Sequence, residues 1–146
     1  MSLPTPDPGL VIRYAYLWRH EAQSGRDEGR KDRPCGVIGT NRTTIGQSQT
    51  SVLPITHTEP SVADMALEIP AAVGSRLGLD AARSWIVLTE ANLFAWPGPD
   101  LRFVEGREPR TIAYGFFRHA SSRTFEAAFL TTTLGAKFRS WSGRKN

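Results

Sequence analysis

Two short segments of the chain join an apolar β-like run to side chains that can handle phosphate. Arg33 immediately precedes the run 34–39, and Thr56 and His57 follow the run 53–55. Arginine is a permanent cation whose planar fork of donors matches phosphate oxygens. A threonine hydroxyl can hold a non-bridging oxygen, and a histidine titrates near neutral pH without special tuning. If the fold brings the two strand ends together, they form a small site for charge on phosphorus, which points toward RNA.

The segments that must position these side chains read as short strands with turns. β-Branched and aromatic residues predict strands over 10–18, 35–39, 51–55, 66–69, 85–90, 92–96 and 101–104. Pro70 and Gly78 predict a short helix over 70–77, and an apolar stripe predicts a final helix over 122–138. Residues 111–117 fit either a strand or the start of the last helix. The sum predicts a mainly β (α+β) fold, a small bent antiparallel sheet or open barrel with one short helix and a C-terminal helix packed outside.

Length and composition indicate one globular domain. The 146 residues are 40% hydrophobic and 22% charged, which is ordinary for such a domain. We expect a flexible proline-rich arm over 1–8, the domain over 9–138, and a basic, frayed tail over 139–146. Residues 19–33 are polar and contain two glycines, so they predict a long flexible loop of the kind that often carries function.

Charge and cysteine content indicate which partners and which cellular compartment to expect. The net charge of +4 and the pI of about 9.7 favour a polyanionic partner. Cys35 is the only cysteine, so no intramolecular disulfide can form. Residues 1–8 do not resemble a secretory leader, and no stretch reaches the length of a membrane span. We therefore expect a cytoplasmic protein.

The order of several motifs resembles the PemK/MazF-type toxins, the endoribonuclease half of a bacterial toxin–antitoxin pair. The resemblance runs from Gly9-Leu10-Val11 through Glu28 to Arg-Pro-Cys-Gly-Val-Ile at 33–38, Val-Leu-Pro-Ile-Thr at 52–56 and the apolar run 84–90. It covers about residues 9–105. The Arg-Pro and Pro-Ile-Thr pairing, in this order, is its most specific part.

This resemblance implies an SH3-like β-barrel, a homodimer and metal-independent cleavage of single-stranded RNA, with no cofactor. The ribose 2′-hydroxyl attacks the adjacent phosphate and leaves a cyclic phosphate. Arg33 would stabilise the charge that develops on the phosphate, and Thr56 would hold an oxygen. Glu28, at the family's acidic position, and His57 are both candidates for the acid or base. His57 departs from the family pattern, in which a small hydroxyl residue is common. A cognate acidic antitoxin is the implied partner.

Further RNA contacts are predicted on the long polar loop and on an aromatic side chain. The basic loop residues are Arg26, Arg30 and Lys31. Acidic residues alternate with them, so the net local charge is small, but the family places this loop beside the RNA groove. Trp96 precedes a Pro-Gly-Pro turn and could stack on a base. Trp18 and Trp85 lie in apolar strands, and we expect them in the core.

Each candidate also has a purely structural alternative. Arg33 could pair with Asp32 or with another acidic neighbour on the loop. The Thr56 hydroxyl could cap the backbone at the end of its strand, and His57 could be an exposed loop residue. Cys35 is expected to be a buried small hydrophobe.

Two other functions stay open at this level. A barrel of the same family could bind RNA or a partner protein without catalysis, which the C-terminal helix and the unusual His57 both motivate. A toxin that inhibits DNA gyrase is the third candidate. The chain has no Gly-Lys-Ser/Thr loop and no Gly-x-Gly-x-x-Gly motif. The spacing of its three histidines argues against a zinc site, so no metal is expected.

Overall fold

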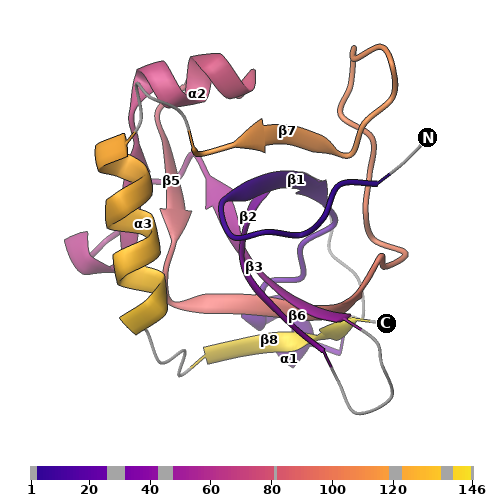
Figure 1. Ribbon diagram of the computed structural model, residues 1–146. Coiled ribbons are helices and arrows are strands. Elements are labelled where there is room, and N and C mark those ends of the chain that lie inside the picture. Colours follow the sequence, from indigo (N-terminus) through magenta and orange to yellow (C-terminus); the bar gives the residue numbers. More distant parts are fainter. Residues whose placement is uncertain are drawn as a thin grey trace.

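A computed structural model of the chain describes residues 3–25, 32–42, 48–80, 82–118, 123–135 and 140–145. These residues form a small open β-barrel with short helices on its outside (Figure 1). The strands are β1 (Leu10–Tyr14), β2 (Arg33–Arg42), β3 (Ser48–Thr56), β4 (Ala66–Ile69), β5 (Ser84–Val87), β6 (Glu90–Trp96), β7 (Ala113–Phe116) and β8 (Ser140–Lys145). The helices are α1 (Arg19–Gln23), the 3₁₀ turn η1 (Ala63–Met65), α2 (Ala71–Leu77) and α3 (Arg123–Gly135). The predicted mainly β architecture is confirmed.

The sheet curls because β3 changes partners along one of its edges. The main strand order is β4-β5-β3-β2-β1-β7, with β6 paired to β3 and β8 paired to β6. On one edge β3 pairs with β2. On the other edge its first half pairs with β6 as far as Val52, and Ile55 begins the pairing with β5. Pro54 lies in the gap between those two pairings, where a residue without an N–H interrupts neither ladder.

Alternation along the strands divides the buried residues into two clusters. On β1, Val11 belongs to one cluster, while Leu10 and Ile12 belong to the other. The first cluster includes side chains from α2 and α3, which stand on the outside of the barrel near β5 in Figure 1. A Cβ added to Gly36 on β2 would lie 2.7 Å from Ile86 Cδ1, so the sheet packs tightly there.

The segment after β1 is buried and anchored, although it is not a strand. Leu17 N–H donates to Asn92 Oδ1 at 2.8 Å, and Asn92 Nδ2 donates to the Leu17 carbonyl at 2.8 Å. Trp18 N–H donates to Glu21 Oε1 at 3.1 Å, which satisfies a free amide at the start of α1. The predicted strand over 10–18 therefore ends at Tyr14. The predicted loop over 19–33 begins with the short helix α1, which the sequence pattern did not predict.

Other predicted boundaries also needed correction. The tail predicted over 139–146 contains β8, which pairs in parallel with β6 and is the exception in an otherwise antiparallel sheet. Residues 101–104 contribute only an isolated bridge between Leu101 and Tyr14. In the segment predicted as a flexible arm, Pro6 is buried and its carbonyl accepts a bond from the Thr40 hydroxyl at 2.9 Å. The helix predicted over 70–77 is confirmed as α2, which ends at the left-handed Gly78 (φ 73°).

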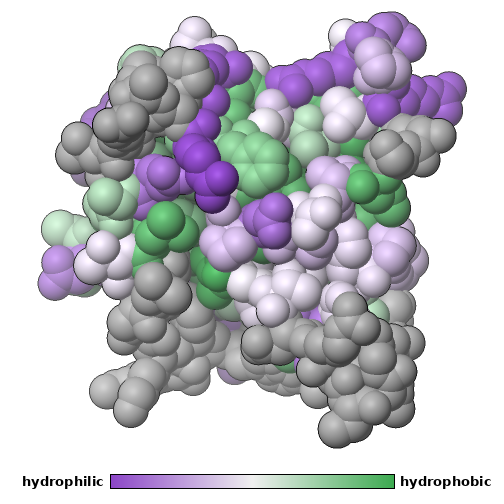
Figure 2. Space-filling view, viewed as in Figure 1, coloured by the Kyte–Doolittle hydropathy of each residue, from purple (hydrophilic) through white to green (hydrophobic). Residues whose placement is uncertain are grey.

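The surface mixes polar and apolar residues. On the face shown in Figure 2, hydrophobic residues form small areas between hydrophilic ones. The exposed large hydrophobic residues of the described chain are Leu3, Val62 and Phe103, on three separate segments. No described helix combines the length and the apolar character needed to cross a bilayer.

Candidate functional site

Arg33, Thr56 and His57 line a single cavity of about 890 Å³. Arg33 begins β2, Thr56 ends β3, and the antiparallel pairing of these two strands brings the two ends to the same edge of the barrel. Further walls come from the segment around α1, from residues 58–61, and from the connection between α2 and β5. The structure therefore brings together the two strand ends that the sequence pattern singled out.

The Arg33 guanidinium is held by an aromatic ring and a backbone carbonyl. Its Cζ lies 4.8 Å from the centroid of the Trp18 ring, and Nη1 donates to the Ile55 carbonyl at 3.4 Å. The Nε atom is buried and has no hydrogen-bond partner among the described residues. Because Ile55 directly precedes Thr56, the cation lies beside the end of β3. Trp18, which we expected in the core, instead lines the cavity and supports this cation.

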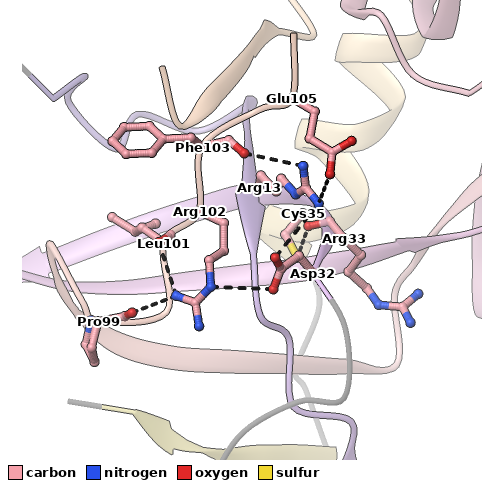
Figure 3. A network of polar contacts seen from close by, with 9 residues as sticks. All are labelled: Arg13, Asp32, Arg33, Cys35, Pro99, Leu101, Arg102, Phe103 and Glu105. Atoms are coloured by element: carbon pink, nitrogen blue, oxygen red, sulfur yellow. Dashed lines mark hydrogen bonds and ion pairs between the residues drawn. The ribbon is translucent and has the colours of Figure 1, made fainter. Parts of the chain in front are cut away.

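The neighbouring Asp32 does not neutralise Arg33. Its carboxylate pairs with Arg13 Nη2 at 3.8 Å and with Arg102 Nε at 3.6 Å. Figure 3 shows the Arg33 side chain pointing away from this network, as expected for consecutive residues at a strand. No described carboxylate forms an ion pair with Arg33, so the alternative pairing with Asp32 is wrong. The other acidic neighbours on the loop, Asp27 and Glu28, lie outside the described residues, so that alternative stays untested.

The Thr56 hydroxyl caps a turn and can still donate a hydrogen bond. Its oxygen accepts a hydrogen bond from the Thr58 N–H at 3.2 Å. A hydroxyl that accepts one bond can still donate its own hydrogen. The structural alternative is therefore confirmed, and it leaves the hydroxyl able to donate to an anion in the cavity.

His57 is oriented through both of its ring nitrogens. Nδ1 lies 2.9 Å from the Arg83 carbonyl, and Nε2 lies 3.6 Å from Asp80 Oδ2. The His57 side chain is 49% exposed, so the ring is held while solvent still reaches it. Asp80 and Arg83 belong to the connection between α2 and β5, and sequence reasoning did not identify them. Their distance from His57 along the chain left no spacing pattern that could have done so.

Arg83 is itself fixed on the outer surface of the barrel. Its Nε and Nη2 donate to the two carboxylate oxygens of Glu68 on β4 at 2.8 and 3.0 Å. Its Cζ lies 4.9 Å from the centroid of the Trp85 ring. The hydrogen bond from Arg83 lowers the pKa of Glu68 below its ordinary value. These contacts secure the segment whose carbonyl faces His57.

One further predicted contact, Trp96, is not among the described residues that line this cavity. Trp96 lies on β6 opposite Ser48 and packs against Phe94, with ring centroids 5.9 Å apart. The structure therefore does not place Trp96 beside Arg33. The predicted candidates Glu28, Arg26, Arg30 and Lys31 lie outside the described residues. Cys35 is fully buried, as expected for a small hydrophobe.

The cavity combines a fixed cation, a hydroxyl and an oriented imidazole around an opening to solvent. Such a set can bind a phosphodiester, stabilise negative charge on it and move a proton. Within the described ranges, no group of three or more His, Cys, Asp or Glu side chains gathers in a way that could hold a metal ion. Comparisons of the chain with protein-family models, curated proteins and solved structures found no match.

Proposed function

We propose that this protein is a toxin-like endoribonuclease that cleaves single-stranded RNA without a metal ion. The observation that supports this most is the shared cavity of Arg33, Thr56 and His57, which belong to two different strand ends. The sequence resemblance to PemK/MazF-type toxins leads to the same chemistry. In this reaction the 2′-hydroxyl attacks the adjacent phosphate and a 2′,3′-cyclic phosphate is formed.

The roles of the cavity residues follow from the charges that develop during the reaction. Negative charge grows on the phosphate oxygens as the new bond forms, and a fixed cation beside them stabilises that charge. Arg33 supplies this cation, because Trp18 and the Ile55 carbonyl already hold its fork in place. Thr56 donates its hydroxyl hydrogen to a non-bridging oxygen. These two groups need not move when the substrate arrives.

The proposed partners also follow from charge and from the resemblance. Single-stranded mRNA in the cytoplasm is the substrate, and the net charge of +4 favours its approach. An acidic antitoxin segment is the inhibitor, since opposite charge speeds association. The active form is a homodimer, as the family resemblance implies.

Cleavage of a labelled single-stranded RNA in the presence of EDTA tests this proposal. Arg33→Ala should slow cleavage by about 10²- to 10³-fold, the range seen when one preorganised donor to a developing oxyanion is removed. Arg118→Ala is the matched control, because Arg118 is 71% exposed and pairs with Glu126 rather than lining the cavity. Circular dichroism spectra should show that both variants fold like the wild type.

The cleavage experiment, together with RNA-binding and DNA-supercoiling assays, separates the alternative functions. Cleavage that EDTA abolishes, or that persists in Arg33→Ala, would contradict the proposal. RNA that stays intact but binds to the wild-type protein would instead indicate a non-catalytic RNA-binding barrel. Inhibition of supercoiling by DNA gyrase, without RNA cleavage, would identify the third candidate.

A further inference from the structure

We infer that His57 is the general acid that protonates the leaving 5′-oxygen, and that Asp80 is the residue that positions it for this role. The inference rests on the proposed function and resolves which step His57 serves. It also adds a residue that the sequence motifs did not indicate. Both side chains line the cavity that contains Arg33 and Thr56.

The Arg83 carbonyl determines which ring nitrogen of His57 exchanges a proton. A carbonyl oxygen can only accept a hydrogen bond, so Nδ1, at 2.9 Å, must carry hydrogen and donate it. Nδ1 therefore stays protonated whether the ring is neutral or charged. Nε2 is therefore the ring nitrogen that can exchange a proton with a substrate.

The Asp80 carboxylate is arranged to favour a hydrogen on Nε2. Asp80 Oδ1 accepts a hydrogen bond from the Ala82 N–H at 3.3 Å, which leaves Oδ2 facing Nε2 at 3.6 Å. A protonated Nε2 attracts this oxygen, whereas an unprotonated Nε2 would set two acceptors against each other. The geometry thus suits an imidazolium that gives a proton, rather than a base that takes one.

The proton on Nε2 remains within reach of a substrate. The separation of 3.6 Å from Oδ2 exceeds a close hydrogen bond, and the two side chains are 49% and 69% exposed. A leaving oxygen can therefore approach Nε2 without displacing a tight ion pair. Asp80 orients the ring without enclosing it.

Both partners of His57 are held by the barrel itself. The left-handed Gly78 ends α2, and Leu79 N–H donates back to the Gly74 carbonyl at 2.9 Å, which sets the path of the chain just before Asp80. On the other side, two hydrogen bonds to Glu68 secure Arg83. The arrangement is therefore present before RNA binds.

Asp80 differs from the other carboxylates that line the cavity. Apart from His57 and Asp80, the charged or titratable residues in the described part of the cavity lining are His20, Asp32, Arg33, Glu59 and Tyr114. Asp32 pairs with Arg13 and Arg102, and Glu59 lies 3.5 Å from Arg83 Nη1. Among the described lining residues, Asp80 is thus the carboxylate that pairs with His57.

The proposed step conserves protons and electron pairs. The O2′–P bond forms as the P–O5′ bond breaks. The proton of the 2′-hydroxyl passes to a water molecule that acts as the base. The proton on His57 Nε2 passes to O5′. The products are a 2′,3′-cyclic phosphate and a 5′-hydroxyl.

An RNA with a bridging sulfur in place of the scissile 5′-oxygen tests the inference. A thiolate leaves without being protonated, so this substrate does not need a general acid. With ordinary RNA, His57→Gln should slow cleavage by about 10²- to 10⁴-fold, the usual contribution of a positioned acid or base. Asp80→Asn should slow it by about tenfold, which is roughly 1.4 kcal/mol of barrier. With the sulfur substrate, both variants should cleave within about threefold of the wild type, well inside the loss expected of a missing acid.

Two further variants make the outcome decisive. Asp64→Asn makes the same chemical change at an exposed carboxylate outside the cavity lining, and it should behave like the wild type. Arg33→Ala should stay slow with both substrates, because the phosphate charge still needs a cation.

Three outcomes would contradict these expectations. If Arg33→Ala cleaves slowly, and His57→Gln is slowed by the same factor with ordinary RNA and with the sulfur substrate, the inference is overturned while the proposed function stands. An Asp80→Asn variant that cleaves ordinary RNA at the wild-type rate overturns the role of Asp80. A wild-type protein that cleaves neither RNA overturns both.

Discussion

The guanidinium of Arg33 lies 4.8 Å from the ring centroid of Trp18, so the cation at the start of β2 rests on an aromatic face rather than on the carboxylate of the adjacent Asp32. The Trp18 backbone N–H is in turn tied to Glu21 in α1. Placement of the cation thus depends on the buried segment after β1 as well as on β2. This relationship leads to a first prediction.

Trp18→Ala should slow RNA cleavage by about two- to fivefold, because the face that orients Arg33 is lost and a cation–π contact contributes about 0.5–1 kcal/mol. Trp18→Phe keeps an aromatic face and should recover most of the rate. Single-turnover rates with labelled RNA measure the difference. Equal rates for Trp18→Ala and Trp18→Phe would show that the ring does not orient the guanidinium.

Asn92→Ala should lower the free energy of unfolding by about 2–4 kcal/mol. The Asn92 side chain is fully buried and bonds to both the N–H and the carbonyl of Leu17. Its loss leaves two buried backbone groups without partners, each at a cost of about 1–3 kcal/mol. Urea unfolding followed by circular dichroism gives the change. A loss below about 0.5 kcal/mol, the usual size of a surface effect, would contradict it.

Gly36→Ala should destabilise the barrel by about 1–3 kcal/mol through overpacking. The added Cβ would lie 2.7 Å from Ile86 Cδ1, an atom that valine lacks. Gly36→Ala should therefore cost less in an Ile86→Val background than in the wild type. A double-mutant cycle from urea unfolding measures this coupling. Strictly additive effects would indicate that the Phe117 ring, rather than Ile86, resists the new methyl group.

Stability should fall as the pH rises above about 10. Burial, followed by electrostatic interaction with Asp100 and with Cys35, raises the pKa of Tyr14 above its ordinary value of 10.0. Above that pH the unfolded chain loses the Tyr14 proton while the folded protein keeps it, so the unfolded state is favoured increasingly. Below that pH the contribution is fully present.

Tyr14→Phe removes this titration and should flatten the decline between pH 10 and 11, the range just above the ordinary pKa of tyrosine. Thermal unfolding at a series of pH values compares the two proteins. Tyr114 also has a raised pKa, mainly through burial, so some slope should remain in the variant. Identical slopes in both proteins would rule out Tyr14 as a source of the alkaline decline.

Much of the fold could be predicted because its signals are local. The helix α2 is set by Pro70 and Gly78, which are neighbours of the residues they control. The end of β1 could not be read in the same way. The apolar run continues to Trp18, but the hydrogen bonds of Asn92, far along the chain, take up the backbone of Leu17 and replace a strand ladder. The parallel β8 also depends on a distant partner, β6.

The residues of the candidate site differ in the same way: some could be predicted from local sequence, and others depend on distant partners. Arg33 and Thr56 could be paired from the sequence because adjacent antiparallel strands bring their ends together. The contributions of Trp18 and Asp80 could not be predicted from the sequence. Trp18 ends an apolar run that reads as part of the core, and Asp80 lies on a surface connection far from His57 along the chain. For Asp32 and Arg33, adjacency in sequence was misleading, since a strand sends consecutive side chains to opposite faces.

The shared strand β3 has a consequence for how the barrel opens. Since β2, β5 and β6 all hydrogen bond to it, neither half of the sheet can detach while β3 remains paired on both edges. Slow amide exchange should therefore be concentrated near Val52 and Ile55, where the two ladders meet, and should report global unfolding rather than local fraying. A protease that recognises only opened chains would find its first cuts elsewhere.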